Sequence, residues 1–135
     1  MIPCYTKAYY NHTLHSIKEE HGTHTLSALI GEHSKAELLK SPQEIQYMRN
    51  ACEISCRAFN RILDDIRVGV TEKDLAARLS MYMVQEGADT QPYGNILISG
   101  ANTSLLHGIP SKKSIEYGDF VLMDFGCQYE GYMSD

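Results

Sequence analysis

The chain has 135 residues, 43% of them hydrophobic, and a formal net charge of −5. This length suits one domain with its own core, and no apolar run reaches the roughly eighteen residues that a membrane-spanning helix needs. The acidic balance comes without a basic stripe, which argues against binding to nucleic acid. We therefore expect a soluble protein that binds neither nucleic acid nor a membrane.

Residues 1–38 give the weakest structural signal, and we treat them as a poorly defined leader. They contain neither the apolar core of a signal peptide nor the composition of a transit peptide, so a cytoplasmic location is expected. Their histidines lack the spacing of known zinc sites, so polar surface or an irregular leader is favoured over metal binding. These histidines are His12, His15, His21, His24 and His33.

A first long helix is predicted from the stretch SPQE onward. Ser41 can cap the helix, Pro42 suits its first position and Glu44 can bond back to the cap. Apolar residues then recur at three- and four-residue steps, and the helix should end by Gly69. The expected buried stripe consists of Ile45, Met48, Cys52, Phe59, Ile62, Leu63 and Ile66.

The cysteines do not form a metal-binding or disulfide pattern. No C-x-x-C spacing occurs among Cys4, Cys52, Cys56 and Cys127. Cys52 and Cys56 are one helical turn apart within the expected apolar stripe, so we expect buried thiols there.

A second helix is predicted after Thr71, which can cap it, and Gly87 should end it. Because the link between the two helices is short, they should be antiparallel neighbours. The expected buried residues are Leu75, Leu79, Tyr82 and Met83.

Strands follow the helices. NILIS predicts a short strand, GANTSLLHGIPSKK a polar loop, and the stretch from Phe120 to Gln128 a second strand. A tight turn around Tyr129, Glu130 and Gly131 should return the chain antiparallel as far as Asp135. The predicted fold class is therefore α+β.

Two aspartates on this hairpin are candidate metal ligands. Phe120, Leu122 and Asp124 share one face of the strand, which we expect to point to the interior. A buried carboxylate needs a partner, and Asp135 is brought back towards Asp124 across the turn. Two neighbouring anions favour a divalent cation between them. In the alternative, Asp124 caps or salt-bridges another group and Asp135 is simply exposed.

His107 is a candidate catalytic residue. It lies in LLHGIP, where Gly108 and Pro110 restrict the backbone just before the acid-bearing hairpin. A neutral imidazole can donate to a developing oxyanion or shuttle a proton. The alternative is an ordinary surface histidine in a loop.

Residues 39–135 resemble a known family. KSPQEIQYMRNACEI, GVTEKDLAARLSMYMVQEGAD and ILISGANTSLLHGIPSKKSIEYGDFVLMDFGCQYEGYMSD follow one another in its order. The stretch is similar to the N-terminal half of the catalytic domain of the pita-bread metallopeptidases. These are the Xaa-Pro aminopeptidases, prolidases, methionine aminopeptidases and the metal-free creatinase, and the Xaa-Pro branch matches best. The resemblance implies an incomplete pita-bread fold, with two long antiparallel helices followed by antiparallel strands.

The resemblance also implies roles for the candidate residues. Asp124 matches the first metal-binding aspartate of the family, and Asp135 matches the second, which bridges two divalent ions (Mn, Co or Zn). His107 matches the histidine that lines the substrate pocket and stabilises the tetrahedral intermediate. The metal ions would polarise the scissile carbonyl and supply hydroxide, so the implied activity is hydrolysis of N-terminal peptide bonds next to proline.

The chain departs from the family pattern in two places. The remaining ligands of the family, a histidine and two glutamates, lie downstream of the matching stretch, and residues 1–38 are too short for the N-terminal domain of the Xaa-Pro branch. Residues 1–38 are compatible with a remnant of that creatinase-like domain. We therefore expect a truncated chain with at most weak metal binding and little peptidase activity alone.

The open sheet edge suggests partners for such a chain. A strand that ends at Asp135 would leave unpaired backbone groups, which could bind a complementing C-terminal half or a second copy. The full-length form would bind a peptide substrate. The alternative function is a non-catalytic binding module that retains half of the fold.

Overall fold

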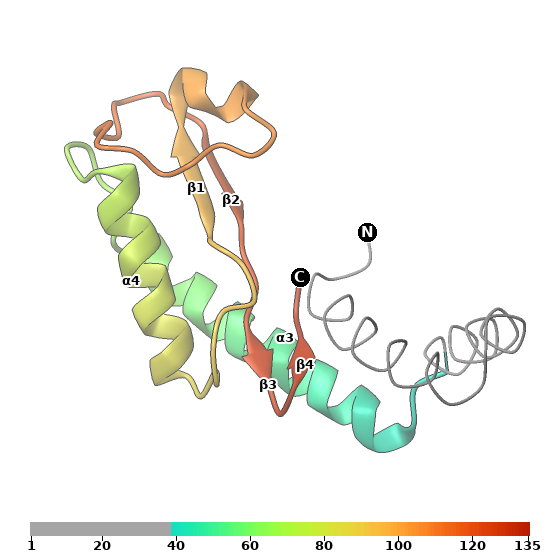
Figure 1. The fold of residues 1–135 in the computed structure, drawn as a ribbon. Helices are drawn as coiled ribbons and strands as arrows, with labels where there is room; N and C mark the ends of the chain where they lie inside the picture. Colours follow the sequence, from blue (N-terminus) through green and yellow to red (C-terminus); the bar gives the residue numbers. More distant parts are fainter. Residues whose placement is uncertain (1–38) are drawn as a thin grey trace, which may run out of the picture. The chain divides into compact units, whose positions relative to one another are not determined.

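The computed structural model describes residues 39–135, in the order α3 (Pro42–Leu63), α4 (Glu72–Gln85), β1 (Ile96–Ser99), η1 (Gly100–Ser104), β2 (Val121–Asp124), β3 (Gln128–Tyr129) and β4 (Tyr132–Met133) (Figure 1). The expectations for residues 1–38, including their histidines and the leader, lie outside the described residues. Among residues 39–135, no helix is both long and apolar enough to cross a membrane.

Helix α3 begins at Pro42, as predicted, but the expected stripe is only partly confirmed: Ile62 is fully buried, and Phe59 and Ile66 pack partly buried against the core. Its buried residues include Ala51, Ser55 and Ala58 together with two isoleucines, whereas Ile45 and Leu63 are exposed. The reason is close packing, because the thiol of Cys127 reaches the carbonyl oxygen of Ala51 at 3.3 Å. Small side chains are needed where another segment approaches a helix so closely, and a search for large apolar residues overlooks them.

Helix α4 matches the prediction more closely. The backbone N–H of Asp74 donates to Oγ1 of Thr71 at 3.1 Å, which is the expected cap. The helix buries Leu75, Leu79 and Met83 completely, and Gly87 follows it with a φ of +110°. Only glycine adopts this backbone conformation without strain, so the chain can turn sharply there.

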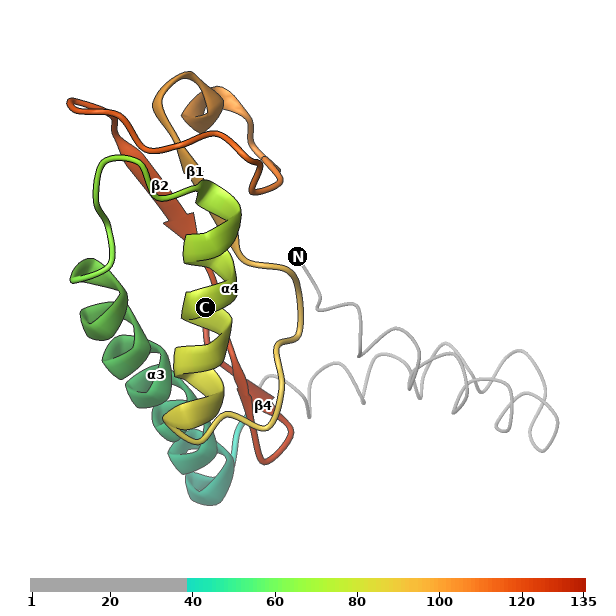
Figure 2. The same ribbon diagram turned by 90° about the vertical axis from the view of Figure 1, so that its left-hand side faces the viewer.

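The two helices lie side by side and antiparallel, as predicted (Figure 2). Arg57 and Arg61 of α3 both form ion pairs with Glu86, just after α4, at 2.8 Å. These contacts lower the pKa of the Glu86 carboxyl group, chiefly through the hydrogen bond from Arg61. The C-terminal end of α4 is thereby fixed to the second half of α3.

The predicted strand from Phe120 to Gln128 is interrupted. Strand β2 pairs antiparallel with β1, with Ile96 opposite Asp124 and Ser99 opposite Val121, whereas β3 pairs with β4. Between β2 and β3 the chain passes Gly126, which lies so close to the carbonyl oxygen of Ser134 that a Cβ there would come within 2.2 Å. This close approach replaces regular strand pairing.

The turn between β3 and β4 has the predicted position. Glu130 and Gly131 connect the two strands with φ angles of 50° and 83°. Positive φ at both central residues is the geometry of a tight hairpin, and it brings Ser134 and Asp135 back beside the segment that follows β2.

The core lies between the two helices and the β1–β2 hairpin (Figure 1). Leu97 of β1 and Cys127 are fully buried in it together with residues of both helices. The fully buried apolar residues of this core are Ala51, Ala58, Ile62, Leu75, Leu79, Met83, Leu97 and Cys127. The core covers one face of the β1–β2 sheet, so side chains on the opposite face of β2 point away from the helices.

Candidate functional site

Asp124 is exposed at the end of β2. Phe120 and Leu122 are exposed on the same face, so the three residues do share a face, but the expectation that it points to the interior was wrong. The alternate residues point to the helices instead, since the ring of Phe125 stacks on Phe59 of α3 at 6.1 Å. The helices cover only this second face, and Asp124 therefore points away from them.

Asp135 is positioned through the residue before it. Ser134 is buried, and its Oγ forms a hydrogen bond with Oγ of Ser55 at 2.7 Å. The same atom accepts a hydrogen bond from the backbone N–H of Cys127 at 3.0 Å. Because Ser134 is held against α3, the exposed side chain of Asp135 is directed to the opposite side.

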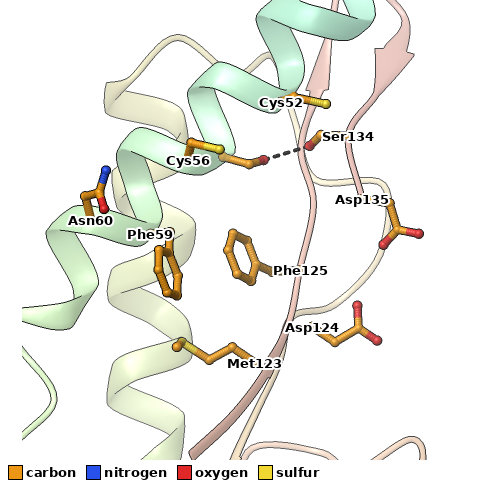
Figure 3. A pocket seen from close by; sticks show the side chains of 10 residues that line it. Cys52, Cys56, Phe59, Asn60, Met123, Asp124, Phe125, Ser134 and Asp135 are labelled. Atoms are coloured by element: carbon orange, nitrogen blue, oxygen red, sulfur yellow. Dashed lines mark hydrogen bonds between the residues drawn. The ribbon is translucent and has the colours of Figure 1, made fainter.

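The structure brings the two carboxylates to the same side of the strand. Figure 3 shows Met123 and Phe125 pointing towards the helices, while Asp124 and Asp135 point to the other side of the strand. Both aspartates help to line a pocket of about 510 Å³, but its other lining residues include Cys56, Phe59 and Phe125, so the pocket lies towards α3 and the two carboxylates point away from it. The turn therefore returns Asp135 to the side of the strand on which Asp124 lies, and both side chains are exposed; their pairing around a metal ion stays a prediction.

Tyr93 is a further member of this group. Its hydroxyl donates to Oδ1 of Asp135 at 2.9 Å. Burial raises the pKa of Tyr93, and the hydrogen bond to Asp135 and the charges of Asp135 and Asp124 raise it further. Both carboxylates therefore act on this phenol. Tyr93 could not be found from the sequence pattern, because it lies in the loop before β1, 42 residues from Asp135 along the chain.

The expected burial of Cys52 and Cys56 was wrong. Both are exposed on the face of α3 that lines the pocket, whereas Cys127 is buried. The reason is that this part of α3 buries the side that carries Ala51, Ser55 and Ala58, and not the side that carries the two thiols. Cys127 instead fills the narrow space beside Ala51 and Ser55.

The two carboxylates fit a divalent cation in chemistry but do not form a complete site. Within residues 39–135, there is no group of three or more His, Cys, Asp or Glu side chains that could hold a metal ion. Carboxylate oxygens are the preferred ligands of hard cations, and two of them with water give weak binding. Further ligands would be needed for a centre with two metal ions.

His107 is exposed in the loop after η1. Gly108 next to it is buried, and a Cβ at this position would lie 2.5 Å from Cδ1 of Ile98. The backbone beside His107 is thus seated on β1. The structure does not show a contact between His107 and either aspartate.

Comparison with known proteins shows the family. The model of metallopeptidase family M24 matches residues 46–135, which is more than half of the chain, and the chain belongs to this family. It is 43% identical over 101 residues to the uncharacterized peptidase YqhT of Bacillus subtilis, covering 75% of this chain and 29% of that protein. It is 37% identical over 98 residues to the Xaa-Pro dipeptidase of Pyrococcus horikoshii, covering 73% and 28%.

Solved structures show the same likeness. The X-Pro aminopeptidase from Thermotoga maritima has a TM-score of 0.75 and 40% identity, covering 78% of this chain and 30% of that one. The prolidase from Pyrococcus furiosus has a TM-score of 0.69 and 35% identity, covering 71% and 30%. The predicted α+β, incomplete pita-bread fold is confirmed. The chain spans only about 30% of the length of these relatives.

Proposed function

We propose that residues 39–135 form the N-terminal half of the catalytic domain of a metal-dependent peptidase that hydrolyses N-terminal peptide bonds next to proline. The observation that carries the proposal is the placement of Asp124 and Asp135 on the same side of the strand. Two such anions repel each other unless a cation lies between them. The relatives named Xaa-Pro dipeptidase and X-Pro aminopeptidase support the preference for proline.

In this proposal Asp124 and Asp135 bind divalent ions (Mn, Co or Zn) in a centre with two metals. When bound, the ions supply Lewis-acid activation of the scissile carbonyl and a hydroxide at neutral pH. Tyr93 would orient Asp135 by donating to Oδ1, so that Oδ2 would be available to hold a cation. Ser55 and Ser134 hold the backbone behind Asp135.

We assign His107 to the substrate pocket. Its imidazole would donate a proton to the oxygen that gains charge when the carbonyl is attacked. The exposure of His107 and the fixed backbone at Gly108 support this role, since the side chain is accessible from a defined position.

The remaining ligands would come from outside these 135 residues. They could follow in the same polypeptide or belong to a separate complementing half. Within residues 39–135 each of the two sheets, β1–β2 and β3–β4, has only two strands, so strand edges are present to which such a half could pair. Self-association through an edge is the third arrangement. The isolated chain should therefore bind metal weakly and cleave peptides poorly.

The test is a cleavage assay on the protein as cells produce it, with an Xaa-Pro dipeptide, an Xaa-Pro-containing peptide and added Mn²⁺. We expect Asp124→Asn and Asp135→Asn to abolish metal-dependent release of the N-terminal residue. Asp64→Asn is the control, because Asp64 is an exposed carboxylate of the α3–α4 link. Full activity of both variants would contradict the proposal, as would robust cleavage by the isolated 135-residue chain.

A non-catalytic binding module is the second candidate function. Large apolar side chains on the outside favour it, since Leu106, Tyr117 and Phe120 are 92%, 96% and 85% exposed. This function predicts that Asp124→Ala leaves partner binding intact. Loss of binding in that variant, with the fold preserved, would argue against it.

A further inference from the structure

A buried carboxylate that the proposed mechanism does not use connects three segments of the chain. Glu72 is the first residue of α4 and has no exposed surface. Its Oε1 accepts hydrogen bonds from the backbone N–H and the hydroxyl of Ser99, at 2.7 and 3.1 Å, and from the amide of Asn102 at 3.0 Å. Its Oε2 accepts from the backbone N–H and the hydroxyl of Ser111, at 3.0 and 2.7 Å.

These donors keep the buried group ionised. Burial alone raises the pKa of Glu72, but the hydrogen bonds from Ser111, Asn102 and Ser99 outweigh burial and hold the pKa at about 2. A carboxylate that accepts this many hydrogen bonds is strongly favoured over the neutral acid. Glu72 is therefore a negatively charged acceptor at neutral pH, to which the surrounding groups are fixed.

The donors come from both sides of His107. Ser99 and Asn102 precede it in β1 and η1, and Ser111 follows it. Backbone bonds close the same junction, since the N–H groups of Glu72 and Lys73 donate to the carbonyl oxygens of Lys113 and Ser111 at 3.0 Å. The segment that carries His107 is thus a loop whose two ends meet at one side chain.

We propose that Glu72 is a positioning residue for His107, because it fixes both ends of the loop between Asn102 and Ser111. The catalytic part of this inference rests on the proposed function, in which His107 faces the substrate. Between these ends, Gly108 is buried against Ile98, whereas Leu105 and Leu106 are exposed. Without the Glu72 carboxylate, both ends of the loop would lose their common anchor while the helical core kept its own contacts.

The test is hydrogen exchange of individual backbone amides, measured by NMR on the 135-residue chain. Glu72→Gln replaces one of the two acceptor oxygens by an NH₂ group, which cannot accept, so either the N–H of Ser99 or the N–H of Ser111 loses its acceptor. We expect at least one of these two amides to exchange about tenfold faster or more, the loss of a charge-assisted hydrogen bond. The imidazole signals of His107 should change as well.

Glu86→Gln is the matched control. Glu86 also accepts charged hydrogen bonds, from Arg57 and Arg61, but lies just after the opposite end of α4. The Glu86→Gln substitution should change the hydrogen-exchange rates of the Ser99 and Ser111 amides no more than that of the Leu79 amide in the core. If Glu72→Gln accelerates the loop amides only as much as the core amides, Glu72 is a general structural residue and the inference is overturned.

Two further variants decide the question if Glu72→Gln does not fold. Asn102→Ala and Ser111→Ala each remove one side-chain donor, on opposite sides of His107, and leave the carboxylate in place. Each should accelerate exchange in the loop while the amide of Leu79 keeps its protection. Unchanged exchange in both variants would overturn the inference.

The cleavage assay separates this inference from the proposed function. If His107→Ala cleaves Xaa-Pro peptides normally, the role of His107 in the proposed function is wrong, and hydrogen exchange still decides whether Glu72 anchors the loop. If His107 is required, Glu72→Gln should lower kcat more than it raises KM, and Glu86→Gln should leave both unchanged.

Discussion

At the scale of single residues, Glu72 and Gly126 show how residues outside the candidate site help to position the residues within it. Glu72 is a buried charge that accepts from the loop of His107. Gly126 leaves room for the carbonyl oxygen of Ser134 and the hydroxyl of Tyr93, so that the chain before Asp135 can lie close against the segment that follows β2. Neither residue is one of the three candidate site residues, but each makes a distinct prediction.

Glu72 should make stability depend on pH. Its pKa in the folded chain is about 2, below its ordinary value of 4.5. Its contribution, on the order of 3 kcal/mol, is therefore fully present above pH 4.5 and is lost as the pH falls towards 2. The difference in unfolding free energy between the wild type and Glu72→Gln should shrink between pH 6 and pH 3 in urea titrations. An equal difference at both pH values would contradict this account.

Gly126→Ala should displace Asp135. A Cβ at Gly126 would lie 2.2 Å from the carbonyl oxygen of Ser134 and 2.7 Å from the hydroxyl of Tyr93, so the backbone must move. We expect a loss of about 1–3 kcal/mol in the free energy of unfolding, measured in urea. Gly94→Ala is the control, since a Cβ there meets nothing within 4 Å. Equal stability of the two variants would show that the approach is not tight.

At the scale of the elements, α3 shows what the sequence could and could not predict. The start of the helix followed from Ser41 and Pro42, because capping depends on neighbours in the sequence. The buried face of α3 could not be predicted in this way, because it depends on contacts with Cys127 and Ser134, which lie near the other end of the described chain. Binary patterning favours large apolar residues, whereas this contact needs small ones.

The corrected face of α3 makes a prediction. Ala58 is fully buried, whereas Cys52, about 1.7 turns earlier, is exposed. Ala58→Leu should overfill the core and cost about 1–3 kcal/mol, because the packed neighbours cannot move apart freely. Cys52→Leu should stay within about 0.5 kcal/mol of the wild type. Thermal unfolding of both variants checks this prediction. A larger loss of stability in Cys52→Leu than in Ala58→Leu would mean that Cys52, and not Ala58, lies on the buried face.

The same limit applies to the predicted second strand. Alternating apolar residues correctly indicated the strand Val121–Asp124 but not the interruption that follows it, and the turn at Glu130 and Gly131 was correctly placed. The direction of the faces was not predictable, because periodicity gives alternation but not which side the helices cover. The face with Asp124 is consequently exposed rather than buried.

At the scale of the whole molecule, the fold was predictable because its elements follow one another in the order of a known family, and the match over residues 46–135 shows that family. The turn at Glu130 and Gly131, which returns Asp135 to the side of Asp124, was predictable because it depends on neighbouring residues, whereas metal binding by the two aspartates stays a prediction. Tyr93 and Glu72 were not predictable, since their partners lie 42 and 39 residues away along the chain. Hydrogen bonds over such separations leave no periodic pattern in the sequence.

The most direct test of the central claim is a titration of the ¹⁵N-labelled chain with Mn²⁺, followed by NMR. A bound paramagnetic ion broadens the signals of nearby amides, so those of Asp124 and Asp135 should broaden before those of α4. The effect should be lost in Asp124→Asn and Asp135→Asn and kept in Asp64→Asn. Broadening that begins elsewhere, or that survives both substitutions, would contradict the assignment of Asp124 and Asp135 as metal ligands.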